Sequence, residues 1–118
     1  MAHKNAAGEL MIKKSKLDSG LLIEMEGVLN SDTSKDVRPE LLEISGQHHL
    51  ILDLSNVSLI TSSGVGVLFE ITDKSLASEK KVILLNPSER VQKVINITGF
   101  NDLFIIADSL ESAKKLIS

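Results

Sequence analysis

The stretch of this chain whose residue types could do chemistry is a run of three hydroxyl side chains before a glycine. Thr61, Ser62 and Ser63 precede Gly64. The apolar residues that follow recur at a spacing compatible with one helical stripe: Val65, Val67, Leu68, Ile71 and Leu76. Hydroxyls before such a stripe are typical of a helix N-terminus, because the first backbone N–H groups of a helix have no partner inside it. The sequence therefore predicts a helix start that presents hydroxyl groups. Its simplest role is a structural cap that stabilises the helix by about 1 kcal/mol.

Two glycines, Gly64 and Gly66, fall in the first turn of this predicted helix. Each destabilises a helix interior by about 0.5–1 kcal/mol relative to alanine, so another interaction must favour them. Close approach of a partner, another backbone or a phosphate is one explanation. Close packing of the helix against its own sheet is the other, and the sequence leaves both open.

Serine-based hydrolysis is excluded by the positions of the histidines. His48 and His49 lie at the entry of the strand that precedes the hydroxyl run, whereas Ser63 lies beyond its exit. Six strand residues separate these ends by roughly 20 Å, far outside hydrogen-bond reach. His3 is close to the N-terminus.

Other catalytic and cofactor sites also lack support. No carboxylate is spaced to complete a metal site with the two adjacent histidines. The chain has no cysteine and no glycine-rich phosphate-binding motif, so thiol catalysis and nucleotide hydrolysis are not expected. Asp53, within an apolar strand, is expected to bond to neighbouring N–H groups. We therefore predict no enzyme activity, no cofactor and no metal.

The elements that must position the hydroxyl run alternate between strands and helices. A hairpin of strands is predicted over residues 9–17 and 21–29, joined by the turn Asp18-Ser19-Gly20. Further strands are expected over residues 50–55, 81–85 and 103–107, with a polar connection over residues 56–58. Besides the central helix, three helices are predicted. The first begins between Asp36 and Pro39 and ends near residue 46; the others run from a cap at Asn86, with Pro87 at the first helical position, to about residue 97, and over residues 110–117. Strands alternating with helices predict a sheet with parallel pairs.

Composition indicates one globular domain. The chain has 118 residues, 42% of them hydrophobic and 25% charged, and a formal net charge of −3. The absence of a basic block and of Trp and Tyr argues against a nucleic-acid or membrane partner. No apolar run approaches the length of a signal peptide core or a membrane span, which favours a cytoplasmic protein. Residues 1–8 are predicted to be a flexible N-terminus.

The central stretch, LILDLSNVSLITSSGVGVL, resembles the signature of STAS domains of the anti-sigma factor antagonist type. That signature has a strand ending in DLS, an apolar pair, and then DSSG-L-G. Residues 27–30 (GVLN) are similar to an earlier G-x-L-D corner of the family. Residues 81–86 and 97–100 fall where the family has a strand and a helix end.

The resemblance implies a single STAS-type domain over residues 9–118, with a mixed β-sheet of about five strands and about four helices packed on it. It matches Ser63 to the serine that a partner kinase phosphorylates. Asn30, Thr61 and Ser62, together with Gly64 and Gly66, would surround this serine and contact the partner. Two residues depart from the family, since Thr61 and Asn30 stand where it has acidic residues.

The function implied is that of an anti-sigma factor antagonist. The unphosphorylated protein would bind an anti-sigma factor serine kinase, which supplies the ATP site, and phosphorylation would switch this binding off. The alternative is a stand-alone STAS subunit that supports a transporter ATPase without phosphoregulation. The replacement of both acidic residues gives this alternative weight.

Overall fold

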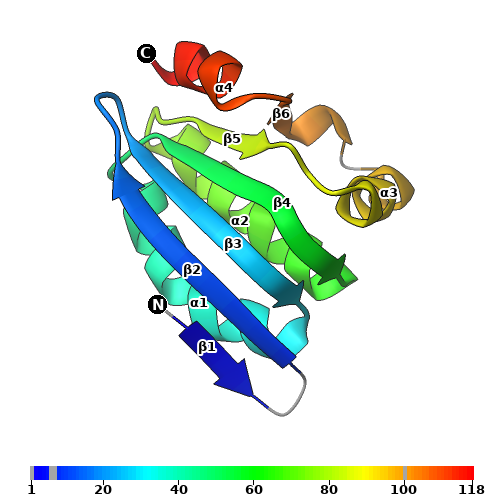
Figure 1. Cartoon of the computed structure of the whole chain (residues 1–118). Helices are drawn as coiled ribbons and strands as arrows, with labels where there is room; N and C mark the ends of the chain where they lie inside the picture. Colours follow the sequence, from blue (N-terminus) through cyan, green and yellow to red (C-terminus); the bar gives the residue numbers. More distant parts are fainter. Residues whose placement is uncertain (1, 6–7, 100) are drawn as a thin grey trace.

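One mixed β-sheet organises the chain (Figure 1). In the computed structural model, which describes residues 2–5, 8–99 and 101–118, six strands pair in the order in which they occur along the chain. They are β1 (Ala2–Asn5), β2 (Gly8–Lys16), β3 (Leu21–Leu29), β4 (Leu50–Ile60), β5 (Val82–Leu85) and β6 (Ile105–Ala107). β2 is antiparallel to both β1 and β3, whereas β3 to β6 are mutually parallel. The predicted mixed sheet is thus confirmed, with β1 as an additional strand.

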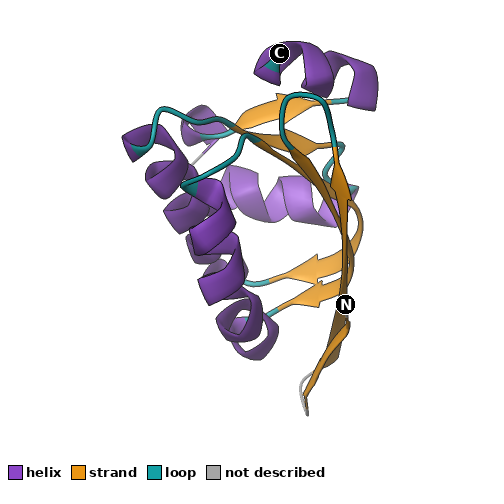
Figure 2. Cartoon of the chain, turned by 90° about the vertical axis from the view of Figure 1, so that its left-hand side faces the viewer, coloured by secondary structure: helices purple, strands orange, loops and turns teal. Residues whose placement is uncertain are grey.

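Helices cover the two faces of this sheet unequally. They are α1 (Ser31–Ser45), α2 (Ser62–Ala77), α3 (Glu89–Thr98) and α4 (Leu110–Ile117), and a 3-10 turn spans Asn101–Leu103. Seen from the side, most of the helical mass lies on one side of the strands (Figure 2). Residues of α1, α2 and α3 share the larger core with β2 to β5. The α4 residues Ala113 and Ile117 instead pack on Ile51, Ile83 and Leu85 from the opposite face.

The apolar periodicity of the sequence predicts seven core residues, and the structure confirms them. Each is at most 7% exposed: Leu52, Leu54, Ile60, Val67, Leu68, Ile83 and Leu85. They divide between the two faces, because side chains alternate along a strand. Leu52 and Leu54 face α1 and α2, whereas Ile83 and Leu85 face α4.

The first helix begins earlier than predicted. α1 starts at Ser31 and carries Pro39 in its interior. Asn30 accepts hydrogen bonds from the backbone of Asp32 and Thr33, and the Thr33 hydroxyl accepts from the Asn30 amide, so a reciprocal cap fixes the start. Pro39 lies on the exposed side of the helix. Water can therefore bond to the carbonyl group that lacks its intrahelical N–H partner.

The connection predicted over residues 56–58 was wrong, because β4 continues through it to Ile60. The register with β3 shifts between Glu24 and Glu26 and again between Gly27 and Val28. Each shift accommodates one extra residue on β4, as a β-bulge does. Polar residues therefore enter this strand without ending it.

Two other boundaries differ from the prediction. α3 is capped by Ser88, whose hydroxyl accepts from the Val91 amide at 3.4 Å, and begins at Glu89. Asn86, the predicted cap, instead adopts a left-handed conformation with φ of 47° and donates its amide hydrogen to the Ala107 carbonyl. β6 begins at Ile105 rather than at residue 103, since the preceding residues form the 3-10 turn. Within the predicted flexible segment 1–8, residues 2–5 form β1, and residues 1, 6 and 7 lie outside the described residues.

Candidate functional site

The hydroxyl run lies where two parallel strands end side by side. Leu29 at the end of β3 pairs with Ile60 at the end of β4. The next amide, that of Thr61, donates to the Leu29 carbonyl oxygen at 2.9 Å. α1 follows the first strand and α2 follows the second, so Asn30 and Thr61 are the N-terminal caps of two neighbouring helices. The sheet thus brings these two predicted site residues together.

The serines of the run are exposed and make no use of their hydroxyl groups within the chain. Ser62 and Ser63 are both exposed, and neither hydroxyl has a hydrogen-bond partner in the described part of the chain. Thr61 has the extended backbone of a cap, but its side chain forms no capping hydrogen bond and instead lies 3.5 Å from the Leu29 carbonyl oxygen. The first turn of α2 closes only with the bond from the Val65 amide to the Thr61 carbonyl, at 3.0 Å. The interpretation of the run as a side-chain cap for α2 is therefore not supported.

Asn30 has a structural role. Its side-chain oxygen accepts hydrogen bonds from the amides of Asp32 and Thr33, each at 3.0 Å. An aspartate could accept the same two bonds. The amide therefore caps α1 as the acid would, but it contributes no negative charge beside the start of α2.

The two glycines differ in their surroundings. A β-carbon on Gly64 would lie 2.7 Å from both the Ile60 side chain and the Leu29 carbonyl oxygen, so this glycine allows α2 to start close against the sheet. A β-carbon on Gly66 would meet nothing within 4 Å. Packing against the sheet therefore explains Gly64 but not Gly66, whose position borders open space.

An ion pair joins the exposed sides of α1 and α2. The Arg38 guanidinium donates to both carboxylate oxygens of Glu70, with its shortest contact at 2.6 Å. These hydrogen bonds lower the pKa of Glu70 and raise that of Arg38. Sequence reasoning missed this link because 32 residues separate its members and no local pattern relates them. It links the exposed surfaces of the two helices whose starts form the site.

The histidines lie at the other end of β4, as predicted. His49 precedes Leu50, and the strand then runs through 11 residues to Ile60. The histidines and Ser63 are thus separated by roughly 30 Å at about 3.3 Å per residue. The His49 Nδ1 accepts a hydrogen bond from the Lys81 amide at 3.0 Å. Burial, followed by the charges of Lys80 and Lys81, lowers the pKa of His49.

Asp53 behaves as its structural interpretation predicts. Its carboxylate accepts hydrogen bonds from the Ser55 amide at 3.0 Å and from the Ser55 hydroxyl at 2.7 Å. The Ser55 amide lies within the first bulge of β4. The acid therefore bonds to a backbone donor where the register of the sheet shifts.

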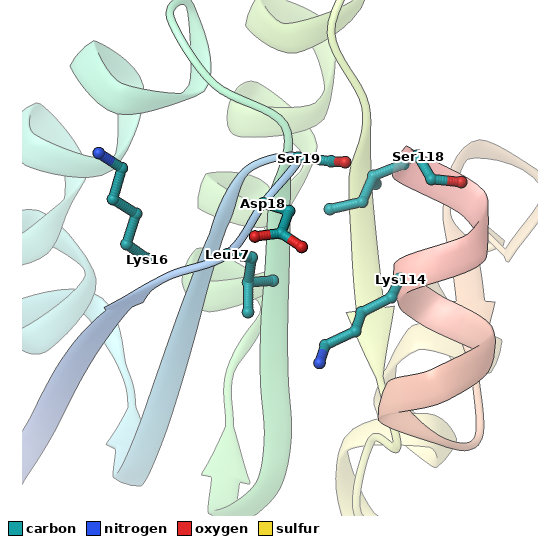
Figure 3. Close-up of a pocket in the computed structure, with 7 residues that line it drawn as sticks. Lys16, Leu17, Asp18, Ser19, Lys114 and Ser118 are labelled. Atoms are coloured by element: carbon teal, nitrogen blue, oxygen red, sulfur yellow. The ribbon is translucent and has the colours of Figure 1, made fainter.

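Hollows elsewhere on the surface do not coincide with the site. One of about 320 Å³ lies between the β2–β3 turn, which contributes Asp18 and Ser19, and the C-terminal end of α4, which contributes Lys114 and Ser118 (Figure 3).

In residues 2–5, 8–99 and 101–118, no group of three or more His, Asp or Glu side chains could hold a metal ion. No helix within the same ranges combines the length and the apolar character that crossing a membrane requires.

Similarity to known proteins identifies the family of this chain. The sequence profile of the STAS domain matches residues 11–113. The chain belongs to the STAS domain family. Among related proteins, the putative anti-sigma factor antagonist BtrV of Bordetella bronchiseptica is 26% identical over 106 residues, covering 88% of this chain and 91% of BtrV. An anti-sigma-B factor antagonist of Staphylococcus epidermidis is 36% identical over 80 residues, covering 62% of this chain and 73% of that protein.

Solved structures share the STAS fold of this chain. The anti-sigma factor antagonist SpoIIAA in its unphosphorylated form superposes with a TM-score of 0.75 at 23% identity, covering 90% of this chain and 96% of SpoIIAA. The phosphorylated form of SpoIIAA from Bacillus gives a TM-score of 0.69 at 22% identity, over 90% and 99% of the two chains. A putative anti-sigma factor antagonist from Thermotoga maritima gives 0.82 at 20% identity, over 90% and 93%. At these identities the likeness establishes the fold.

Proposed function

We propose that this STAS protein is a cytoplasmic anti-sigma factor antagonist that binds an anti-sigma factor serine kinase and is released by phosphorylation of Ser63. The observation that carries the proposal is the exposed Ser63 hydroxyl at the start of α2, which has no hydrogen-bond partner among the described residues. It stands in a chain whose relatives are named anti-sigma factor antagonists. The kinase supplies the ATP, in keeping with the lack of a phosphate-binding motif in this sequence.

The start of α2 is suited to carry a phosphate. The Ser62, Ser63 and Gly64 amides precede the first intrahelical bond, which the Val65 amide makes, and the Thr61 side chain does not cap them. Free amides and the positive end of the helix dipole both favour an anion there. Phosphorylation of Ser63 should therefore leave the fold intact. That both forms of SpoIIAA share the fold of this chain supports this expectation.

The switch works on the partner rather than on the domain. A phosphate adds roughly −1.5 to −2 charges and three acceptor oxygens at an exposed position. A partner surface that is acidic, or that fits closely around the bare hydroxyl, is repelled. The open space at Gly66, one helical turn from Ser62 and Ser63, is where such a partner can approach the backbone of α2.

The experiment is a pull-down of the cognate kinase with the full-length chain and with three variants. Ser63→Ala should bind constitutively in the presence of ATP. Ser63→Asp should bind more weakly, although less so than the phosphorylated protein because it carries only about one charge. Gly66→Leu should reduce binding while remaining folded, because its side chain extends into open space. Equal binding by all four proteins would refute the proposed docking surface.

A second candidate function is favoured by Asn30 and Thr61, which stand where the family has acidic residues. Asn30 is occupied as the cap of α1, and Thr61 is neutral, so neither supplies the negative charge that the family has beside its serine. A stand-alone STAS subunit of a transporter ATPase complex, without phosphoregulation, would need no such charge. Intact-mass analysis of the bound and free protein separates the two: a phosphate confined to the free fraction supports the antagonist. An unmodified chain bound to a transporter ATPase supports the scaffold.

A further inference from the structure

A small hollow lies at the end of β4 that is opposite Ser63. Its volume is about 260 Å³, and we call it the His49 hollow. Three connections of the chain contribute basic side chains to its lining: Lys16 lies before the β2–β3 turn, His48 and His49 in the α1–β4 loop, and Lys80 in the α2–β5 loop. Sites for drug-sized molecules usually measure about 300–1,000 Å³, so the size of this hollow suits a smaller ligand.

The three connections are fixed to one another by hydrogen bonds and close packing. The Leu21 amide donates to the His49 carbonyl oxygen at 2.9 Å, and a β-carbon on Gly20 would lie 2.3 Å from the same oxygen. The Lys81 amide donates to His49 Nδ1 at 3.0 Å, and the Lys81 carbonyl accepts the Leu50 amide hydrogen at 2.9 Å. The lining is therefore held in place without a ligand, which reduces the entropy that binding would lose.

His49 carries a hydrogen-bond donor that the chain leaves unused. A neutral imidazole that accepts a hydrogen bond at Nδ1 carries its own hydrogen on Nε2. Since His49 Nδ1 accepts from the Lys81 amide, its Nε2–H is a donor, and this donor has no acceptor among the described residues. Burial, followed by the charges of Lys80 and Lys81, lowers the pKa of His49. The two lysine charges thus reach the imidazole and favour a negative ligand beside it.

Two ammonium groups at the hollow are unpaired. Within residues 2–5, 8–99 and 101–118, neither Lys16 nor Lys80 forms an ion pair or a hydrogen bond through its side chain, whereas Lys14 pairs with Glu40. Lys80 is also partly buried. A partly buried cation without a counter-ion is a favourable place for an anion to bind, because the anion replaces lost hydration.

The carboxylates near the hollow do not neutralise these cations. Asp18 borders the hollow, but Figure 3 shows its carboxylate on the side of the hairpin that faces α4, whereas Lys16 extends to the opposite side. No ion pair joins these two residues in the described part of the chain. Glu79 precedes Lys80, but it is exposed and is not part of the lining.

The C-terminal ends of α1 and α2 do not account for the lysines either. A helix C-terminus attracts Lys and His through its partial negative charge. Here backbone amides already bond to the last carbonyl groups: the His48 amide donates to Ile44 at 2.9 Å, and the Lys80 amide donates to Ser75 at 2.8 Å. The Lys80 ammonium has no carbonyl partner among the described residues, so it remains available to a ligand.

We infer that the His49 hollow binds a small inorganic phosphate anion, phosphate or pyrophosphate, through the ammonium groups of Lys16 and Lys80 and the Nε2–H of His49. All three groups are donors and two are positively charged, which matches the several negative oxygens of such an anion. A carboxylate has only two oxygens and would leave one donor unused. This site is independent of the proposed Ser63 switch, because the 11 residues of β4 separate the two.

A titration of the full chain with sodium pyrophosphate at constant ionic strength, followed by ¹H–¹⁵N NMR, tests the inference. Saturable shifts should be confined to residues 16–21, 47–49 and 80–81, and the Nε2 resonance of His49 should move with them. Inorganic phosphate should produce the same pattern with a higher dissociation constant, because it carries less charge. Sodium chloride at equal ionic strength should produce no saturable shift.

Lysine variants show whether the named groups hold the anion. Lys16→Gln and Lys80→Gln should each raise the dissociation constant about 2–5-fold, and the double variant should raise it about tenfold. Lys93→Gln is the matched control, since it removes one charge at an exposed position of α3 and should leave binding unchanged. Circular dichroism verifies that each variant is folded.

Three results would overturn the inference. The first is a set of shifts that grows without saturation or spreads over lysines throughout the chain, as ionic screening alone produces. The second is saturable binding centred on the start of α2. The third is a titration that Lys80→Gln leaves unchanged while urea denaturation shows a loss of stability, because Lys80 would then serve only the end of α2.

Discussion

Gly64 and Leu29 lie so close together that a β-carbon on Gly64 would be 2.7 Å from the Leu29 carbonyl oxygen. Leu29 is the last residue of β3, and the same carbonyl accepts the Thr61 amide hydrogen at 2.9 Å. One backbone group thus fixes both where β4 ends and how closely α2 can start. Ser62 and Ser63 are the two residues between Thr61 and Gly64, so this contact also fixes where the backbone of Ser63 lies.

The two glycines of α2 should respond oppositely to alanine. Gly64→Ala should destabilise the fold by about 1–3 kcal/mol, because the new methyl group overlaps backbone that cannot easily move. Gly66→Ala should be neutral or stabilise by up to about 1 kcal/mol, because it fills open space and lowers the backbone entropy of the unfolded chain. Urea denaturation measures both. An equal loss of stability in the two variants would contradict the assignment of only Gly64 to packing.

The core and the central helix were predictable from the sequence because strong local patterns specify them. The apolar run of β4 and the helical stripe after Gly64 place Leu52 and Val67 inside, and both are buried. The start of α1 was predicted too late, although the residues that fix it lie close together in the sequence. Pro39 argued for a late start of α1, but the reciprocal bonds of Asn30 and Thr33 outweigh it.

The membership of the candidate site stays a prediction from the sequence motif, whereas its geometry comes from the structure. The residues near Ser63 follow from a motif, and the structure brings Asn30 and Thr61 to adjacent strand ends. That the Thr61 hydroxyl does not cap α2 could not be predicted, because the hydroxyl lies instead beside the carbonyl of Leu29, a residue distant in the sequence. The Arg38–Glu70 pair likewise depends on how α1 and α2 pack.

Leu52 provides the test of the core. It is fully buried between the sheet and the helices. Leu52→Ala should therefore lower the free energy of unfolding by about 2–5 kcal/mol through lost burial and the cavity left behind. Leu76→Ala, at an exposed position, should change it by less than about 0.5 kcal/mol. Comparable denaturation midpoints for the two variants would show that the core is misassigned.

Asn30 allows the cap to be separated from the missing charge. Asn30→Ala should destabilise the fold by about 1 kcal/mol, since the Asp32 and Thr33 amides lose their acceptor. Asn30→Asp should keep the stability within a few tenths of a kcal/mol, because aspartate caps equally well. If the family's acid assists phosphoryl transfer, Asn30→Asp should also speed phosphorylation. Thermal denaturation and a phosphorylation time course measure the two effects, and an aspartate variant as unstable as the alanine variant would disprove the capping role.

The His49 pKa predicts how stability depends on pH. Burial and the charges of Lys80 and Lys81 lower it from the ordinary value of 6.5, and the Lys81 amide needs an unprotonated Nδ1. In the window between the lowered pKa and 6.5 the unfolded chain binds more protons than the folded chain, so stability falls as the pH drops below about 6.5. His49→Asn retains an acceptor without titrating and should flatten this part of the profile. A wild-type profile as flat as that of the variant would contradict the assignment.

Phosphosite mapping after incubation with the cognate kinase and ATP tests the central claim most directly. Intact mass should show a single phosphate, and fragmentation should place it on Ser63. The phosphorylated protein should keep its circular dichroism spectrum and lose its affinity for the kinase. A phosphate found only on Thr61 or Ser62 would contradict the assignment of the switch to Ser63. No phosphate at all, with tight binding retained, would contradict the antagonist mechanism.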